Sequence, residues 1–236
     1  MSSDPMASTR VRWLLGRLPI FVLVVAAGCG PKRLAVLGPL SDAAQTARSF
    51  EDRTRLVEPV SIDFAWELSE SGSRVSGIGV ARLEPPYRAR LDLFLNNDET
   101  VLTAALVDDE LRLPAGSPDD ILPPVGLMWA TLGVFRPMRE TRFVGGDRLE
   151  GGAERLRYRY ADGTELHYEV GAGLVRALEL LEGESVVQWV RLTSDVGDRY
   201  PTAATYRNLV DYRELKITRK SVTVTDGFDP GIWDPR

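Results

Sequence analysis

Strict alternation of apolar and polar residues constrains the fold of this chain more than any other feature. In the segment 60–68 (VSIDFAWEL), every second residue is large and apolar, and the residues between them are small or polar. This period of two is typical of a β-strand with one buried face. Similar segments recur, separated by short turns rich in Gly, Asp and Asn. They predict further strands at 74–83, 87–95, 99–107, 110–113, 155–160, 164–170, 174–181, 185–193 and 202–208, and one or two more within 211–225.

Two segments break this alternation and predict helices. Ser41 and Asp42 form a helix-start signal before residues 43–55, which are good helix formers with few apolar positions. The segment 125–135 (VGLMWATLGVF) has no charged residue and is apolar nearly all round, and Pro137 stops it. It is too short to span a bilayer, so it predicts a short helix that is buried or meets an apolar partner.

The predicted elements define a mainly β fold. One antiparallel sheet of about 10 to 11 short strands has to curl, close or be covered. Because the two helices need a surface to cover, a single curved sheet suits the order of elements better than a sandwich. We therefore expect an open half-barrel, with the N-terminal helix and the short apolar helix over its concave face. Gly77, Gly79 and Ala81 share one strand face, which predicts strong curvature or the close approach of a bulky group.

The N-terminal segment reads as a targeting signal that is not part of the fold. Arg10, Arg12 and Arg17 form a positively charged region before the apolar run 18–27 (LPIFVLVVAA). This run is too short to span a bilayer but has the length of the hydrophobic region of a signal peptide. An ordinary secretory signal and a lipoprotein signal both fit these residues.

The end of this run resembles the lipobox of bacterial lipoproteins. Ala26, Ala27 and Gly28 stand directly before Cys29, the single cysteine of the chain, although Ala26 occupies a position where Leu is usual. The resemblance implies cleavage between Gly28 and Cys29, and acylation of the new N-terminal cysteine by a diacylglycerol and an N-linked chain such as palmitate. Gly30 stands where an Asp would imply retention in the inner membrane, which favours the outer membrane. The chain then divides into a signal peptide (1–28), a lipid-anchored tether (29–40) and a folded domain (41–236).

The predicted domain resembles the LolA/LolB class of lipoprotein carriers in three local features. A meander runs through 79–82, 87–94 and 101–106, where an RLDLF strand precedes the hairpin TVLTAALVDDELRL. The segment 122–133 (LPPVGLMWATLG) is similar to the helix that these carriers place over the sheet. The lipobox is shared with the membrane-bound acceptor LolB and absent from the soluble shuttle LolA. The resemblance implies an open half-barrel whose concave face holds helices around a cavity for acyl chains.

Apolar side chains on the inner strand faces and on the short helix are candidates for such a cavity. Filled cores and apolar ligand pockets use the same residue types, so simple core packing explains these residues equally well. The candidates are Phe64, Trp66, Leu91, Leu93, Leu127, Met128, Trp129, Leu132 and Phe135.

The chain offers little for catalysis or metal binding. One His and one Cys exclude a zinc site of the CxxC type and a disulfide within the chain. His167 alternates with glutamates on a polar strand face, which favours a solvated surface histidine over a catalytic or metal-binding one. The acidic pairs Asp108-Asp109 and Asp119-Asp120 lie at turns, where Asp commonly forms local hydrogen bonds. No GxSxG, P-loop or GxGxxG context is present, so we expect no enzyme activity and no cofactor.

The charge balance also argues against a nucleic-acid-binding protein. A net charge of −5 and a pI of about 5.1 leave no overall basic footprint for nucleic acid. Arg155, Arg157 and Arg159 form a row that could touch acidic lipid head groups. A solvated strand face opposite glutamates of the neighbouring strand explains the row more simply.

Two functions follow from these observations. The first is a monomeric membrane-anchored lipoprotein that binds acyl chains or lipidated proteins in an apolar cavity, for transport or insertion at the outer membrane, facing the periplasm. The second is a structural or partner-binding envelope lipoprotein with the same fold and a filled core. A cavity between the 125–135 helix and the sheet would separate the two.

Overall fold

The computed structural model describes residues 33–117 and 121–235. Leu34–Arg236 forms one compact unit, and the entire core of the described chain lies within it. The predicted signal peptide, Gly28, Cys29 and the pair Asp119-Asp120 lie outside the described residues. Within the described ranges, no helix is long and apolar enough to cross a membrane.

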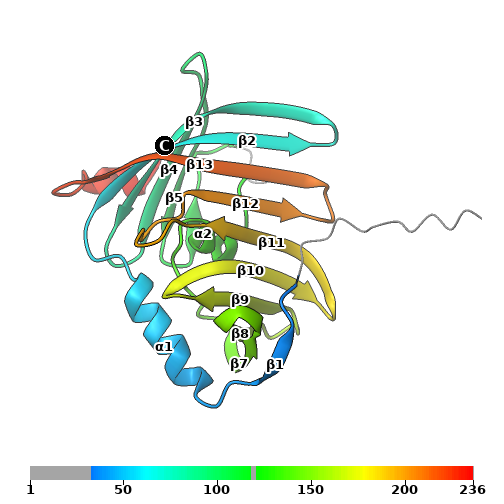
Figure 1. Ribbon diagram of the computed structural model, residues 1–236. Coiled ribbons are helices and arrows are strands. Elements are labelled where there is room, and N and C mark those ends of the chain that lie inside the picture. Colours follow the sequence, from blue (N-terminus) through cyan, green and yellow to red (C-terminus); the bar gives the residue numbers. More distant parts are fainter. Residues whose placement is uncertain (1–32, 118–120, 236) are drawn as a thin grey trace, which may run out of the picture. The chain divides into compact units, whose positions relative to one another are not determined.

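A single open sheet of 13 antiparallel strands forms the fold (Figure 1). Its order is β1-β7-β8-β9-β10-β11-β12-β13-β2-β3-β4-β5-β6, so β1 and β6 are the free edges. The curved sheet with covering helices that the alternation predicts is confirmed. The strands are β1 (Val36–Pro39), β2 (Val60–Glu70), β3 (Ser73–Glu84), β4 (Arg88–Leu95), β5 (Thr100–Val107), β6 (Glu110–Arg112), β7 (Arg142–Leu149), β8 (Glu154–Arg159), β9 (Glu165–Gly171), β10 (Leu174–Glu182), β11 (Ser185–Thr193), β12 (Ala203–Asn208) and β13 (Arg213–Val224).

The structure has two strands that the sequence did not predict. Strand β1 lies within the expected tether, and β7 follows the apolar helix. In β7 only Gly146 and Leu149 are buried, so the strand shows no alternation that sequence reasoning could detect. Gly146 is needed for packing, since a Cβ there would lie 3.0 Å from the Cβ of Ala43. The glycine therefore lets the N-terminal helix approach the sheet closely.

The predicted N-terminal helix is confirmed as α1 (Ala43–Thr54), a surface helix with one narrow packed face. Its buried residues, Ala43, Ala47, Phe50 and Thr54, follow helical spacing and form one stripe. The Thr54 hydroxyl accepts a hydrogen bond of 2.9 Å from the backbone N–H of Phe135 and donates one of 3.0 Å to the Phe50 carbonyl. This contact joins α1 to the segment that follows α2.

Helix α2 (Val125–Thr131) ends before the predicted boundary at residue 135. Gly133 adopts a φ of +80°. The Gly133 N–H bonds to the Ala130 carbonyl at 2.8 Å, and the Val134 N–H bonds to the Trp129 carbonyl at 3.0 Å. These two bonds define a Schellman motif, in which a left-handed glycine ends the helix. The glycine, rather than Pro137, is therefore the stop signal.

The core fills the concave side of the sheet, where every residue of α2 except the partly buried Val125 is buried. In Figure 1, α2 lies behind β10, β11 and β12, which it contacts directly. On its other side, the Trp129 indole N–H donates a 2.9 Å hydrogen bond to the Asp108 carbonyl. The Trp129 ring also meets Tyr87 edge to face, with centroids 6.0 Å apart. Helix α2 thus holds the two halves of the curved sheet together.

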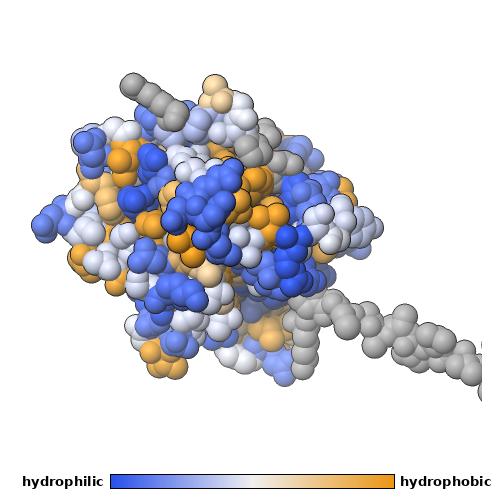
Figure 2. All heavy atoms as spheres, turned by 90° about the horizontal axis from the view of Figure 1, so that it is seen from above, coloured by the Kyte–Doolittle hydropathy of each residue, from blue (hydrophilic) through white to orange (hydrophobic). Residues whose placement is uncertain are grey.

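Hydrophobic residues are dispersed on the part of the surface that Figure 2 shows. On this face they form small separate groups among hydrophilic residues.

The C-terminal 3-10 turn η2 (Pro230–Trp233) packs against β4 and β5 and buries Trp233 against Phe228. These two aromatic residues anchor the C-terminal tail to the sheet.

The predicted close approach at the small residues of β3 is also confirmed. A Cβ at Gly79 would lie 2.4 Å from the Phe64 ring, and one at Gly77 would lie 1.9 Å from the Phe94 carbonyl oxygen. The Trp66 indole N–H reaches over Gly77 to the carbonyls of Ile78 at 2.9 Å and Phe94 at 3.2 Å. Large aromatic side chains of β2 therefore occupy the space that side chains on β3 would need.

We expect Gly77→Ala to lower the free energy of unfolding by about 1 to 3 kcal/mol, because the methyl group would collide with backbone rather than with a movable side chain. Urea denaturation of the variant measures this loss. Ser76→Ala, one residue away and exposed, is the matched control with an expected change within about 0.5 kcal/mol. Equal stability of Gly77→Ala and the wild type would show that the strand needs no glycine here.

Candidate functional site

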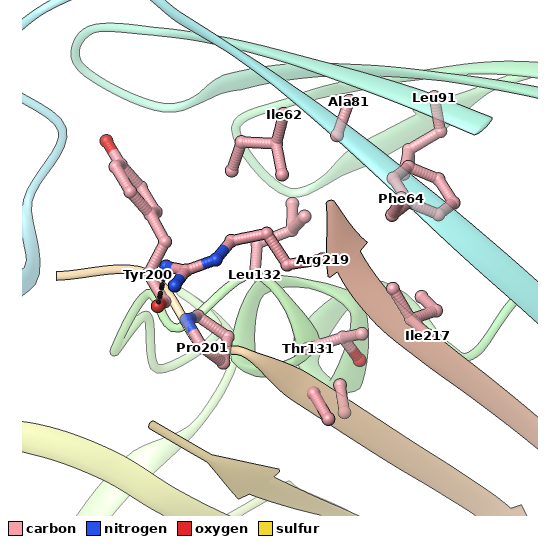
Figure 3. Close-up of a pocket in the computed structure, with 12 residues that line it drawn as sticks. Ile62, Phe64, Ala81, Leu91, Thr131, Leu132, Tyr200, Pro201, Ile217 and Arg219 are labelled. Carbon is pink, nitrogen blue, oxygen red and sulfur yellow. Dashed lines mark hydrogen bonds between the residues drawn. The ribbon is translucent and has the colours of Figure 1, made fainter. Parts of the chain in front are cut away.

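An apolar pocket lies between the C-terminal end of α2 and the concave face of the sheet (Figure 3). Its volume is about 30 Å³ in this structure, enough for about one or two water molecules. Strands β2, β3, β4, β12 and β13 form its walls, and the loop between β11 and β12 closes one side. The residues that line it are Ile62, Phe64, Ala81, Leu91, Thr131, Leu132, Tyr200, Pro201, Ala203, Ala204, Ile217 and Arg219.

The loop 194–202, here called the strap, closes the pocket. Pro201 packs against Gly133, where a Cβ would lie 2.8 Å from the proline Cδ. The Arg199 guanidinium donates a hydrogen bond to the Arg55 carbonyl after α1. Arg219 on β13 holds the strap from the pocket side. These contacts lie mostly at the C-terminal end of the strap, where the Tyr200 side chain is also buried.

Arg219 makes two contacts with the strap. Its Nη1 donates a 2.8 Å hydrogen bond to the Tyr200 carbonyl oxygen, and its Nη2 contacts the Asp198 carboxylate. Figure 3 shows the side chain running along the pocket toward that carbonyl group. The Arg219 side chain is 20% exposed and the Asp198 side chain 35% exposed. The guanidinium group therefore stands where the pocket meets the strap.

The structure divides the nine predicted cavity residues into two groups. Phe64, Leu91 and Leu132 line the pocket. The other six are buried in the core and do not contribute to its lining: Trp66, Leu93, Leu127, Met128, Trp129 and Phe135. Phe135, for example, lies within aromatic contact of Tyr168, with centroids 4.6 Å apart. The part of α2 that meets the pocket is its C-terminal end.

Sequence reasoning missed the strap and Arg219. The alternation along β13 gave one signal for Arg219. Leu215, Ile217 and Arg219 are two residues apart and therefore lie on the same, inward face of the strand. A charged residue at an inward position costs desolvation free energy unless it has a partner. It therefore marks a position worth examining. The strap residues Tyr200 and Pro201 gave no comparable signal.

His167 lies outside the pocket on β9 and is partly buried rather than solvated as expected. Its Nε2 is 2.6 Å from Glu165, and its side chain is 13% exposed. Within the described ranges, no group of three or more His, Cys, Asp or Glu side chains could hold a metal ion. Arg159 of the predicted arginine row bonds Glu165 of the adjacent strand at 2.7 Å, as expected for a structural face.

We expect the pKa of His167 to lie below its usual 6.5, because burial disfavours the imidazolium form more than Glu165 favours it. A lowered pKa means that the unfolded chain binds the proton more readily. Stability from this group is therefore present above pH 6.5 and declines as the pH falls below it. Because the chain has one His, a proton NMR titration reads this value directly. A midpoint above 6.5 would mean that the Glu165 ion pair dominates instead.

Comparison with known proteins identifies the fold and no more. No protein-family model and no curated protein sequence matches this chain. A DUF1329 family protein from Desulfovibrio piger is similar in structure, with a TM-score of 0.55, 11% identity, and coverage of 83% of this chain and 97% of that one. A domain from Vibrio parahaemolyticus, described as an outer membrane lipoprotein-sorting protein, has a TM-score of 0.51, 10% identity, and coverage of 81% and 94%.

A third similar structure is a LolA superfamily protein from Nitrosomonas europaea. It has a TM-score of 0.48, 9% identity, and coverage of 80% of this chain and 96% of that one. The fold rests on the first two structures, which match nearly their whole length. The chain therefore shares the fold of these two structures, an open curved sheet with a helix on its concave face.

Proposed function

We propose that this protein binds the acyl chains of a lipid or of a lipidated protein in the pocket beneath the strap. The chain is bound and released unchanged, and no bond is made or broken. The observation that carries the proposal is the lining of the pocket, in which apolar side chains of five strands and α2 converge under a separate loop. An apolar lining with few polar groups suits a hydrocarbon chain. The lipoprotein-sorting description of the Vibrio neighbour, which shares the fold, fits the same role.

The pocket has to expand to take a chain, because about 30 Å³ holds only about one or two water molecules. Lifting the strap breaks two hydrogen bonds and one partly exposed ion pair, at a cost of about 1 to 4 kcal/mol. It also exposes the buried Tyr200 side chain, which costs about 2 kcal/mol more. Burying about ten methylene groups contributes about 8 kcal/mol. The gain exceeds the cost, so a bound chain can hold the strap open.

We also propose that the protein is lipid-anchored at Cys29 after cleavage behind Gly28, and that it faces the periplasm from the outer membrane. The lipobox-like residues support this proposal, together with the fold shared with the Vibrio domain. Several acyl chains on one cysteine hold a protein at a membrane durably, at about 0.8 kcal/mol per buried methylene. Cys29→Ser is expected to release the protein from washed membranes, whereas retention of that variant would contradict the anchor.

Lipid extraction tests the binding proposal. Residues 30–236, which contain the complete compact unit, are purified from a bacterial host without detergent and extracted with organic solvent. Mass spectrometry is expected to find acyl lipid in near-stoichiometric amount. Ala204→Leu fills the pocket from β12 and should remove most of this lipid. Ala177→Leu is the matched control, because Ala177 is equally buried but pairs with Glu169 and Arg191 away from the pocket.

Two results would contradict acyl binding. The first is a stable wild-type domain that carries no lipid and takes none up from vesicles. The second is equal lipid loss in Ala204→Leu and Ala177→Leu, which would place the lipid elsewhere. In the first case the partner-binding lipoprotein with a filled core becomes the better interpretation.

A further inference from the structure

One charged side chain stands in the apolar pocket. Arg219 is the single charged residue among the described residues that line it. It occupies an inward position on β13, opposite Phe64 of β2, and is followed by an irregularity in the strand pairing. Four-fifths of the side chain is shielded from solvent. Apolar binding sites commonly contain a few placed polar groups of this kind, and these groups fix the orientation of the ligand.

The polar contacts of the Arg219 side chain are both with the strap. The guanidinium group contacts the Asp198 carboxylate and the Tyr200 carbonyl oxygen. It is a planar fork of five donors that suits a carboxylate or phosphate better than a carbonyl group. Asp198 is the more exposed of the two ionic partners, so water can solvate it when it is released. An anion from outside can therefore replace it.

We propose that Arg219 receives the anionic head group of the bound amphiphile, a carboxylate or a phosphate, in place of Asp198. The ligand class is then an acyl chain that ends in an anion, rather than a neutral lipid. The same exchange frees the strap from β13, so recognition of the head group and opening of the pocket are coupled. This inference rests on the proposed function, because the chain has to enter the pocket for its head group to reach Arg219.

Three probes with the same chain test the inference on delipidated residues 30–236. They are dodecanoate, dodecyl phosphate and dodecanol, compared by calorimetric titration at slightly alkaline pH. The wild type is expected to bind the two anions at least about tenfold more tightly than the alcohol. Inorganic phosphate, which lacks the chain, is expected not to compete. Competition by inorganic phosphate would assign Arg219 to a free anion and overturn the proposal.

Substitutions at the contact give the second set of outcomes. Arg219→Met should abolish the preference for anions while dodecanol still binds. Asp198→Asn removes the competing carboxylate and should strengthen dodecanoate binding several-fold. Arg207→Met, which removes an arginine paired with Glu214 outside the pocket, should change nothing. Thermal unfolding of each variant confirms that it is folded.

The results distinguish this inference from the proposed function. Equal binding of all three probes, with no effect of Arg219→Met, overturns the head-group role and leaves the acyl pocket standing. Binding of none of the probes overturns both proposals together. If Arg219→Met does not fold, Asp198→Asn decides alone, and unchanged or weaker dodecanoate binding in that variant overturns the inference.

Discussion

Trp129→Ala is expected to lower the free energy of unfolding by about 3 to 5 kcal/mol. The Trp129 side chain is fully buried on α2, at the centre of the concave side of the sheet. Its indole N–H bonds the Asp108 carbonyl at 2.9 Å, and its ring packs against Tyr87. Alanine leaves a large cavity and an unpaired carbonyl oxygen. Urea denaturation followed by far-ultraviolet circular dichroism measures the loss.

Trp129→Phe separates the contribution of ring packing from that of the hydrogen bond. It keeps most of the ring and removes the hydrogen bond to Asp108, so the expected loss is only about 1 to 2 kcal/mol. A loss below about 1 kcal/mol for Trp129→Ala would contradict the role of α2 as the element that fills the half-barrel. Because Trp129 is a core residue, lipid lost from a Trp129 variant is not informative about the pocket.

Arg136→Met is expected to cost about 2 kcal/mol, between the values for an exposed and a buried ion pair, because the arginine is buried while its two carboxylate partners are partly exposed. The Arg136 side chain is only 8% exposed and lies 2.8 Å from Asp109 and 3.2 Å from Asp108. The guanidinium group also lies over the Tyr87 ring at 3.9 Å. Methionine removes the buried charge between two carboxylates at the β5–β6 turn and leaves them with the exposed Arg139 as a cationic partner. Chemical denaturation at low ionic strength measures the loss.

Arg139→Met is a control that uses the same two carboxylates. Arg139 contacts Asp108 at 3.5 Å and Asp109 at 3.6 Å, but its side chain is 74% exposed. Exposed ion pairs contribute about 0 to 1 kcal/mol, so this variant should remain close to the wild type. Similar losses for both variants would show that charge at this turn matters more than the burial of Arg136.

The sequence predicts most of the sheet because an exposed outer face and a buried inner face impose a visible period. Strand β2 shows this period over its first half, and its Val60, Phe64 and Trp66 are buried as predicted. Strand β7 carries no such signal, because packing against α1 requires Gly146 at its centre rather than a large side chain. Strand β1 is only four residues long and is mostly exposed. Backbone pairing alone adds it to the sheet.

The candidate site was harder to predict for a different physical reason. Inward side chains such as Trp66 and Leu93 pack into the core, whereas Phe64 and Leu91 face the pocket, although all four share one hydrophobic pattern. What separates them is the position of the strap, which is fixed by tertiary contacts such as Arg219 with Tyr200. No local pattern records contacts of that kind. The predicted cavity residues as a set therefore stay a prediction, which ligand binding has to test.

The most direct test of the central claim locates the acyl chain itself. Residues 30–236 with labelled isoleucine and leucine methyl groups are mixed with dodecanoate, and nuclear Overhauser effects between chain and methyl protons are recorded. Acyl binding beneath the strap predicts contacts to Ile62, Leu132 and Ile217, which line the pocket. Contacts confined to exposed residues such as Leu209, or no contacts at all, would contradict it.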